Sequence, residues 1–168
     1  MAAPTAPDVD PLALEQQVCF ALSITNRAVL AVYRPLLEPL GLTHPQYLVM
    51  LTLWDRQKAG QQKPLSVKEI AATLQLDSAT LSPMLKRLEA LGLITRTRNA
   101  VDERTTDVKL TDSGTALRRR ACKIPPAVVA RLGVEMDELR HLHQVLTRIN
   151  SAALAAGALQ ASTTQEQA

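Results

Sequence analysis

Aromatic residues and cysteines are scarce in this chain of 168 residues. One Trp, one Phe and two Tyr leave the core to be built from Leu, Val, Ile and Ala, as in packed helices. The two cysteines lie far apart, which excludes a CxxC metal or redox motif. His141 and His143 are two residues apart on an expected helix and face different ways, so they make a poor metal pair. We therefore expect neither a metal nor a cofactor.

Long hydrophobic runs are also lacking. No stretch approaches the roughly 20 apolar residues that a membrane helix needs, and the N-terminal MAAPTAPDVDP lacks the basic and apolar segments of a signal peptide. We expect a cytoplasmic protein without membrane contact, in which cysteines are normally reduced. A content of 46% hydrophobic and 21% charged residues is typical of one globular domain. The pI near 9.1 favours a nucleic-acid partner only weakly.

Several local signals mark helices in the first part of the chain. Apolar residues recur at helical spacing over 11–33, and Pro35 is expected to end that helix soon afterwards. Thr43 as N-cap and Pro45 in the first turn predict a second helix, which runs to about Asp55.

Two short helices in close succession are predicted next. Ser66 and Glu69 are spaced as a capping box, which begins a helix of two to three turns. The following helix has Asp77 or Ser78 as its cap and Gly92 as its C-terminal stop. Two such helices joined by a tight turn are typical of a helix-turn-helix.

After the second of these helices, the residue pattern changes from one typical of a helix to one typical of β-strands. The segments ITRTR and TTDVKL are rich in β-formers, with the turn-rich NAVDER between them, so they predict a hairpin in the position of a wing. Thr111 then caps a helix that runs to about Cys122 and is broken by Pro125 and Pro126. A last helix is expected over 136–156.

The predicted fold is mainly α with a small β-hairpin, as a winged helix-turn-helix over 43–111. The apolar faces of the flanking helices, within 11–42 and 112–157, exceed what one small winged lobe can cover. We therefore expect them to form the dimerisation region of a two-fold homodimer. The tails 1–10 and 158–168 are expected to be disordered.

The second helix of the pair carries candidate DNA-reading residues. Leu81, Leu85, Leu88 and Leu91 are expected to form its buried stripe. Short hydroxyls and cations near a helix N-terminus suit the major groove of double-stranded DNA. The alternative is a solvated face, or a helix-turn-helix used for protein contacts. The side chains left toward solvent are Ser78, Thr80, Ser82, Lys86 and Arg87.

The hairpin supports DNA as the partner. Arg96 and Arg98 alternate on one strand and are expected to face the same side. Asp102 and Arg104 at the tip can form an ion pair that directs the arginine into a minor groove. The alternative is an ordinary charged turn.

The stretch LDSATLSPMLKRLEALGLITRTRNAVDERTTDVKLTDSG resembles the winged helix of the MarR family of bacterial repressors. The matching features are the helix pair, the D-x-R wing and the following T-x-x-G. With the flanking helices, the resemblance spans nearly all of the chain. It implies a homodimer that binds a pseudo-palindromic operator in double-stranded DNA.

The stretch QVCFALSITNRAVLAVYRPLLEPLGLTHPQYLVMLTLWD is similar to the OhrR branch of that family, which senses organic hydroperoxides. The resemblance implies that Cys19 is the oxidised thiol, since only a thiolate reacts readily, and that Tyr33 supplies it with a hydrogen bond. Fourteen residues along one straight helix span about 21 Å. Tyr33 could therefore serve Cys19 only from the other chain of the dimer.

The chain departs from the OhrR pattern at two positions, where His44 and Ser23 replace tyrosines that are usual there. His44 could donate a hydrogen bond or, as imidazolium, stabilise a thiolate, or it could simply be exposed. Cys122, beside three arginines, is a candidate resolving thiol, with a small cellular thiol as the alternative.

Two other functions are alternatives to a peroxide-sensing repressor. In one, a small aromatic or lipid-like ligand releases the repressor and Cys19 is a structural, buried residue. In the other, the protein is an enzyme such as a thiol peroxidase. The sequence has no Gly-rich cofactor loop and no convincing Cys–His pair, so we expect no enzymatic activity.

Overall fold

The computed structural model describes residues 10–60 and 63–158, so the predicted disordered tails lie almost wholly outside it. The N-terminal elements are η1 (Leu14–Gln16), α1 (Val18–Leu37), η2 (Glu38–Leu40) and α2 (His44–Lys58). The middle of the chain forms β1 (Leu65–Ser66), α3 (Val67–Leu74), α4 (Ser78–Ala90), β2 (Ile94–Arg98) and β3 (Thr106–Leu110). The last elements are α5 (Asp112–Ala121), α6 (Ile124–Leu132) and α7 (Met136–Ala155).

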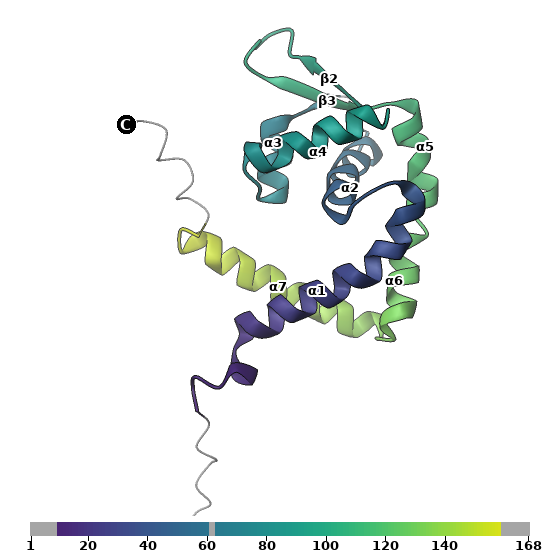
Figure 1. Cartoon of the computed structure of the whole chain (residues 1–168). Helices are drawn as coiled ribbons and strands as arrows, with labels where there is room; N and C mark the ends of the chain where they lie inside the picture. Colours follow the sequence, from purple (N-terminus) through teal and green to yellow (C-terminus); the bar gives the residue numbers. More distant parts are fainter. Residues whose placement is uncertain (1–9, 61–62, 159–168) are drawn as a thin grey trace, which may run out of the picture.

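The winged lobe is formed by α2, α3, α4 and the sheet, with α1 and α7 extending below it (Figure 1). Helices α5 and α6 follow one another down one side and connect the wing to α7. The predicted mainly helical winged helix-turn-helix is confirmed. Among the described residues, no helix is long and apolar enough to cross a membrane.

Helix caps form where the sequence predicts them. The Thr43 amide donates to the Gln46 side chain at 2.9 Å, and the Gln46 amide donates back to the Thr43 hydroxyl at 3.5 Å. Ser66 and Glu69 form the second capping box. Asp77, rather than Ser78, caps α4, since its carboxylate accepts from the Thr80 amide at 2.6 Å.

Two helix boundaries in the first part of the chain were predicted wrongly. Helix α1 begins at Val18, after a separate 3-10 turn, and continues two residues beyond Pro35. Pro35 lies in the last turn, so it removes one hydrogen bond there, and the burial of Leu37 in the core favours the continued helix. Helix α2 reaches Lys58 rather than Asp55.

The sheet has three strands instead of the predicted two. Its order is β1-β3-β2, with both pairs antiparallel. Leu65 of β1 and Arg96 of β2 both lie opposite Val108 of β3. Strand β1 has only two residues, so it has no alternating pattern from which it could be predicted.

The segment after α5 also differs from the prediction. Helix α5 ends at Ala121, before the two prolines, as expected, but a further helix, α6, begins at Ile124. Pro125 and Pro126 lie in its first turn, where a backbone N–H has no helical partner to lose. The prolines therefore begin a helix here as well as ending one.

Most of the hydrophobic core lies inside the winged lobe, between α2, α3, α4 and the sheet, and it continues to Leu37 of α1 and into α5 and α6. Leu81, Leu85 and Leu88 are buried as predicted, whereas Leu91 is 38% exposed. Leu91 is the C-cap of α4, and at 100° per residue it lies well off the buried stripe. After the left-handed turn at Gly92, Leu93 takes the buried position instead.

Gly114 allows the close packing of α5 on the lobe. A Cβ at this position would lie 2.0 Å from the backbone oxygen of Leu93. The Gly114 amide donates to the capping hydroxyl of Thr111 at 3.0 Å, and its carbonyl accepts from Trp54 Nε1 at 2.9 Å. The T-x-x-G segment therefore joins the wing, α2 and α5.

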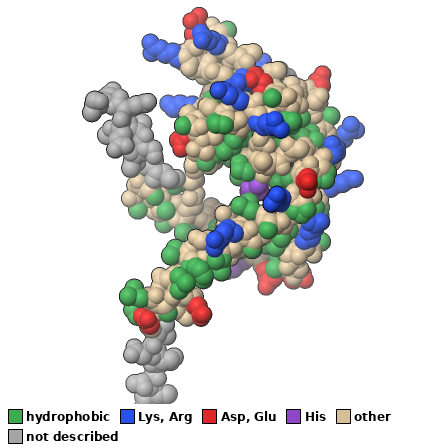
Figure 2. Space-filling model, in the orientation of Figure 1, with side chains coloured by type: hydrophobic (Ala, Val, Ile, Leu, Met, Phe, Trp, Pro, Cys, Tyr) green, Lys and Arg blue, Asp and Glu red, His purple; other side chains and the backbone are tan. Residues whose placement is uncertain are grey.

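Helices α1 and α7 carry apolar side chains that the described chain leaves uncovered. Helix α7 contains no buried residue, and Figure 2 shows apolar side chains along the outer part of α1. The exposed large apolar residues on these two helices are Val18, Leu22, Ile24, Met136, Leu142, Leu146 and Ile149.

Candidate DNA interface and thiol site

The hydroxyl groups at the start of α4 are partly used inside the helix. The Thr80 hydroxyl donates to the Asp77 carboxylate at 2.9 Å, and the Ser82 hydroxyl donates to the Ser78 carbonyl at 2.7 Å. The bonds from the Thr80 amide and hydroxyl lower the pKa of Asp77. Thr80 and Ser82 therefore present oxygen lone pairs outward and are suited to accept hydrogen bonds from base amino groups or water.

The two cations of α4 lie on different sides of the helix. Lys86 is exposed one turn after Ser82, on the same face. Arg87 lines a cavity of about 540 Å³ together with Arg34 and His44, on the side of the helix that faces α1 and α2. The structure therefore does not bring all five predicted residues of α4 onto one surface.

Arg96 anchors the wing to α4. This contact was not predicted from the sequence. Its Nε and Nη2 donate to Oε2 of Glu89 at 2.9 and 2.6 Å, and its amide donates to Oε1 at 3.2 Å. These hydrogen bonds lower the pKa of Glu89. Arg96 is thus turned back onto α4, whereas Arg98 is exposed. The two arginines stay two residues apart on β2, as predicted, but they differ in exposure because Glu89 holds Arg96.

The wing tip is shaped by bonds from side chains to the backbone. Asp102 accepts from the Arg104 amide and from the Thr105 hydroxyl, each at 3.0 Å. The predicted ion pair between Asp102 and the Arg104 side chain is absent from the described residues. Asn99, not predicted as a site residue, accepts from the Val101 amide at 2.8 Å, as an Asx turn does. The loop is therefore fixed while the Arg104 side chain stays exposed.

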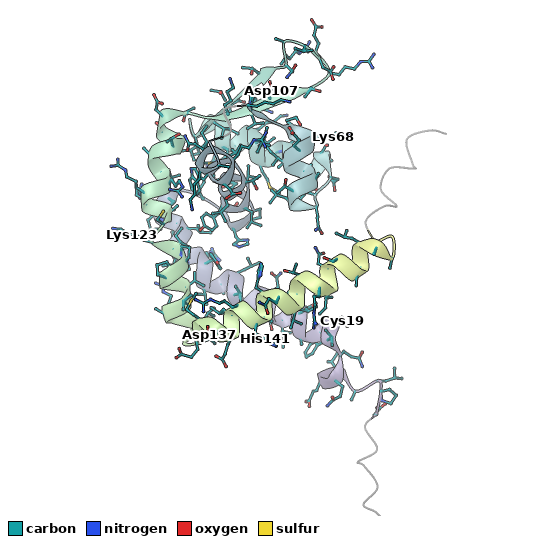
Figure 3. All side chains as sticks on the ribbon, turned by 180° about the vertical axis from the view of Figure 1, so that it is seen from behind. Cys19, Lys68, Asp107, Lys123, Asp137 and His141 are labelled. Atoms are coloured by element: carbon teal, nitrogen blue, oxygen red, sulfur yellow. The ribbon has the colours of Figure 1, made fainter. Side chains whose placement is uncertain are left out.

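Cys19 lies in the first turn of α1 and is exposed. Helix α1 is continuous from Val18 to Leu37, so Cys19 and Tyr33 of one chain are about 21 Å apart along it. Figure 3 places Cys19 near the outer end of α1 and Lys123, the neighbour of Cys122, on the opposite side of the molecule. Within one chain, the thiol cannot reach either predicted partner.

Tyr33 and His44 lie together where α1 meets α2. Their rings pack edge to face with centroids 4.9 Å apart, and Tyr47 lies 6.2 Å from Tyr33. Burial raises the pKa of Tyr33 and lowers the pKa of His44. The lowered pKa favours the neutral form of His44, and so favours its role as a hydrogen-bond donor over its role as an imidazolium. Both residues can still donate a hydrogen bond.

Cys122 is exposed at the junction of α5 and α6. It lines a cavity of about 220 Å³ that Tyr47, Lys58 and Arg118 also line. Of the three preceding arginines, Arg120 is engaged elsewhere, since its Nη2 donates to the Pro39 carbonyl at 2.6 Å. His141 and His143 are exposed, and no cluster of metal-ligating side chains is found in the described part of the chain.

The comparisons with known proteins decide the family. Residues 31–119 match the family described as transcriptional regulator SarA/Rot. The organic hydroperoxide resistance transcriptional regulator of Bacillus subtilis is 40% identical over 137 residues, covering 82% of this chain and 89% of that protein. This chain belongs to the MarR/SarA family of winged-helix regulators. It is therefore a DNA-binding transcriptional regulator, as the resemblance of its wing implied.

Two further bacterial regulators are similar to this chain. TtmR of Methylorubrum extorquens is 44% identical over 133 residues, covering 79% of this chain and 65% of TtmR. AbfR of Staphylococcus epidermidis has been solved in a reduced form on DNA, with a TM-score of 0.66 and 31% identity, covering 84% of this chain and 94% of AbfR. Its disulfide form gives a TM-score of 0.57 and 31% identity, with coverage of 85% and 91%.

Arg104→Ala is expected to weaken operator binding and to lower the slope of log K against log salt by about 1. Figure 2 shows basic side chains over the wing and α4, and Arg104 lies exposed at the wing tip. Arg96→Ala is the matched control. Because the Arg96 side chain is bound to Glu89, this variant should lose thermal stability and keep its salt slope.

Fluorescence anisotropy of a labelled operator duplex at several salt concentrations measures both variants. An unchanged slope for Arg104→Ala would remove that residue from the DNA interface. A lowered slope for Arg96→Ala would mean that its pairing with Glu89 opens when DNA binds.

Proposed function

We propose that this regulator is a homodimeric repressor that releases its operator when an organic hydroperoxide oxidises Cys19. The observation that carries the proposal is the placement of Cys19 and Tyr33 at opposite ends of one unbroken helix. In a two-fold interface, the same patch of both subunits meets, so residue i of one chain contacts residue j of the other. Two α1 helices crossing near their middle would place Cys19 beside Tyr33 and His44 of the partner subunit.

The uncovered apolar side chains of α1 and α7 support the dimer. Leu22 and Ile24 lie between the two ends of α1 and are more than one-third exposed. Covering them removes apolar surface from water, which favours association. The proposed dimerisation region is therefore 11–42 together with 112–157. It would hold the two winged lobes, residues 43–111, at the spacing of a pseudo-palindromic operator.

The proposed chemistry is a two-step oxidation of sulfur. The Cys19 thiolate attacks the outer peroxide oxygen, the O–O bond breaks, and the leaving alkoxide takes a proton to become an alcohol. The product is a sulfenic acid at Cys19. A second thiol then attacks this sulfur, forming a disulfide and releasing water. Tyr33 and His44 would donate hydrogen bonds to the thiolate and so favour it over the thiol.

Cys122 is our candidate for the second thiol. It is exposed, and its cavity carries the cationic side chains of Lys58 and Arg118, which favour a thiolate. AbfR, a member of the same family, has been solved both reduced on DNA and with a disulfide. The existence of reduced and disulfide forms of AbfR supports oxidation followed by disulfide formation in this chain.

Anisotropy of a labelled duplex from the gene's own upstream region tests the proposal. Reduced protein should bind tightly, and cumene hydroperoxide should weaken binding by about 10- to 100-fold, a typical allosteric coupling. Dithiothreitol should restore it. Cys19→Ser should bind DNA like the unchanged protein and ignore the oxidant. A covalent dimer on non-reducing electrophoresis that is lost in Cys122→Ser would assign the second thiol to Cys122.

A ligand-released repressor is the alternative. The cavity between α1, α2 and Arg87 of α4 is lined by Leu30, Leu37 and Leu42, which suits a small aromatic or lipid-like molecule. In that case Cys19→Ser would leave the response unchanged. If the oxidant did not change the DNA affinity of the unchanged protein, the peroxide-sensing function would be rejected and the ligand-released repressor would be favoured.

A further inference from the structure

Val101, at the tip of the wing, is the most exposed large apolar side chain in the described part of the chain, at 97%. It lies in the loop 99–105, which extends beyond α4 at the far end of the winged lobe (Figure 1). The dimer proposed above would cover α1 and α7, which extend from the other side of the lobe, so it leaves Val101 in water. A single exposed apolar residue is common on protein surfaces. What distinguishes Val101 is the loop that holds it.

The backbone of this loop is fixed by hydrogen bonds on both sides of Val101. Asn99 Oδ1 accepts from the amides of Val101 and Asp102 at 2.8 and 3.0 Å. The side-chain amide of Asn99 donates to both carboxylate oxygens of Asp107, at 3.2 and 3.0 Å. The Thr105 amide donates to the Asp102 carbonyl at 2.9 Å. The Val101 side chain is therefore presented outward by an ordered backbone, so a partner that covers it has little ordering cost to offset.

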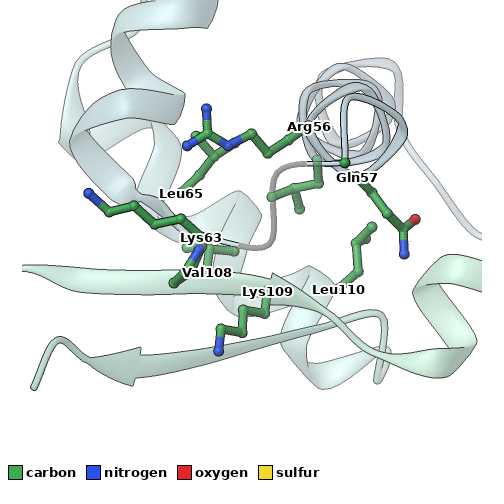
Figure 4. Close-up of a pocket in the computed structure, with 10 residues that line it drawn as sticks. Arg56, Gln57, Lys63, Leu65, Val108, Lys109 and Leu110 are labelled. Carbon is green, nitrogen blue, oxygen red and sulfur yellow. The ribbon is translucent and has the colours of Figure 1, made fainter.

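The base of the wing is fixed to the lobe as well. Val108 of β3 is buried in the core. Figure 4 shows Leu110 on the side of β3 that faces α2, and Lys109 on the opposite side. On the other strand, Arg96 is bound to Glu89 near the end of α4. The position of the wing tip relative to α4 is therefore set by both strands.

The wing tip and α4 are suited to different grooves of the duplex. A helix fits the major groove, which is about 12 Å wide, whereas the minor groove, about 6 Å wide, admits only side chains. With α4 in the major groove, the tip extends past the helix toward the adjacent minor groove. Arg104, exposed three residues after Val101, suits the negative potential of a narrow minor groove. Val101 would meet the floor of the same groove.

We propose that Val101 is a specificity-determining residue that contacts the minor-groove floor and selects A·T over G·C base pairs beneath the wing. An A·T pair presents only acceptor atoms there, whereas a G·C pair adds the amino group of guanine. The isopropyl group of Val101 cannot accept a hydrogen bond, so it would cover that amino group and leave it unpaired, which is costly. Arg104 responds to charge and groove width instead. The two residues of the tip would thus read different properties of the DNA, and neither depends on oxidation of Cys19.

Anisotropy of the reduced, full-length protein on a series of operator duplexes tests the proposal. Each base pair that flanks the α4 half-sites is made A·T, G·C or inosine·cytosine, which is G·C without the amino group. Beneath the wing, the unchanged protein should bind A·T and inosine·cytosine alike, and G·C about tenfold or more weakly. Val101→Thr keeps the shape of the side chain and offers a hydroxyl to the amino group, so it should lower this ratio to about threefold or less. Its salt slope should not change, because no charge is removed.

Thr97→Val, the reverse exchange at an exposed position of β2, is the matched control and should keep the ratio. An unchanged ratio in Val101→Thr would overturn the proposal and assign the preference to Arg104 and groove width. Equal binding of all three pairs by the unchanged protein at every flanking position would also overturn it, as would equally weak binding of inosine·cytosine and G·C. Because Val101 is exposed, its replacement should leave thermal melting unchanged. No oxidant enters these measurements, so their failure is distinguishable from failure of the proposed peroxide response.

Discussion

The substitution Gly114→Ala is expected to unfold the winged lobe under conditions where the unchanged protein is folded. The added Cβ would lie 2.0 Å from the Leu93 oxygen and 3.0 Å from its carbonyl carbon, both backbone atoms. That oxygen already accepts from the Thr111 amide at 3.1 Å, so neither chain segment can move without breaking bonds at the base of the wing. We expect a loss of at least about 4 kcal/mol in the free energy of unfolding.

Urea denaturation measures this loss, followed by the fluorescence of Trp54, the single tryptophan, which is bonded to the Gly114 carbonyl. Ser113→Ala is the matched control because Ser113 is exposed on the same turn, and it should change the free energy by less than about 0.5 kcal/mol. A loss below about 1 kcal/mol for Gly114→Ala would show that α5 can shift away from Leu93.

The substitution Tyr33→Phe is expected to slow the oxidation of Cys19 by about tenfold or more. Under the proposed function, the Tyr33 hydroxyl donates a hydrogen bond to the thiolate of the partner subunit, and bonds to charged groups contribute about 1.5–3 kcal/mol. Losing it would raise the pKa of the Cys19 thiol and lower the thiolate fraction at pH 7. Tyr47→Phe makes the same change at the cavity of Cys122 and should leave the rate nearly unchanged.

Mixed dimers distinguish whether Tyr33 acts on Cys19 of the other subunit or on Cys19 of its own subunit. A dimer of one Cys19→Ser chain and one Tyr33→Phe chain has a single Cys19, on the chain that has lost its tyrosine hydroxyl. If Tyr33 acts across the interface, this thiol faces the intact Tyr33 of the other chain and reacts at the unchanged rate. Stopped-flow oxidation of differently tagged, co-purified chains measures it. A slow rate in the mixed dimer would contradict the two-fold arrangement of α1.

Local signals in the sequence determined much of this protein. The caps at Thr43, Ser66 and Asp77 were predictable because each bond joins residues three apart. The helix pair and the hairpin were predictable from their periods and turn residues. The spacing of Cys19 and Tyr33 on one helix likewise required no tertiary information, and it underlies the proposed function.

Tertiary structure decided the features that join distant segments. The two-residue strand β1 exists because β3 pairs with it, and Arg96 turns inward because the end of α4 places Glu89 beside it. Burial at the junction of α1 and α2 lowers the pKa of His44 and favours its neutral form. These contacts depend on how elements far apart in the chain come together, and neither local propensity nor spacing carries that information.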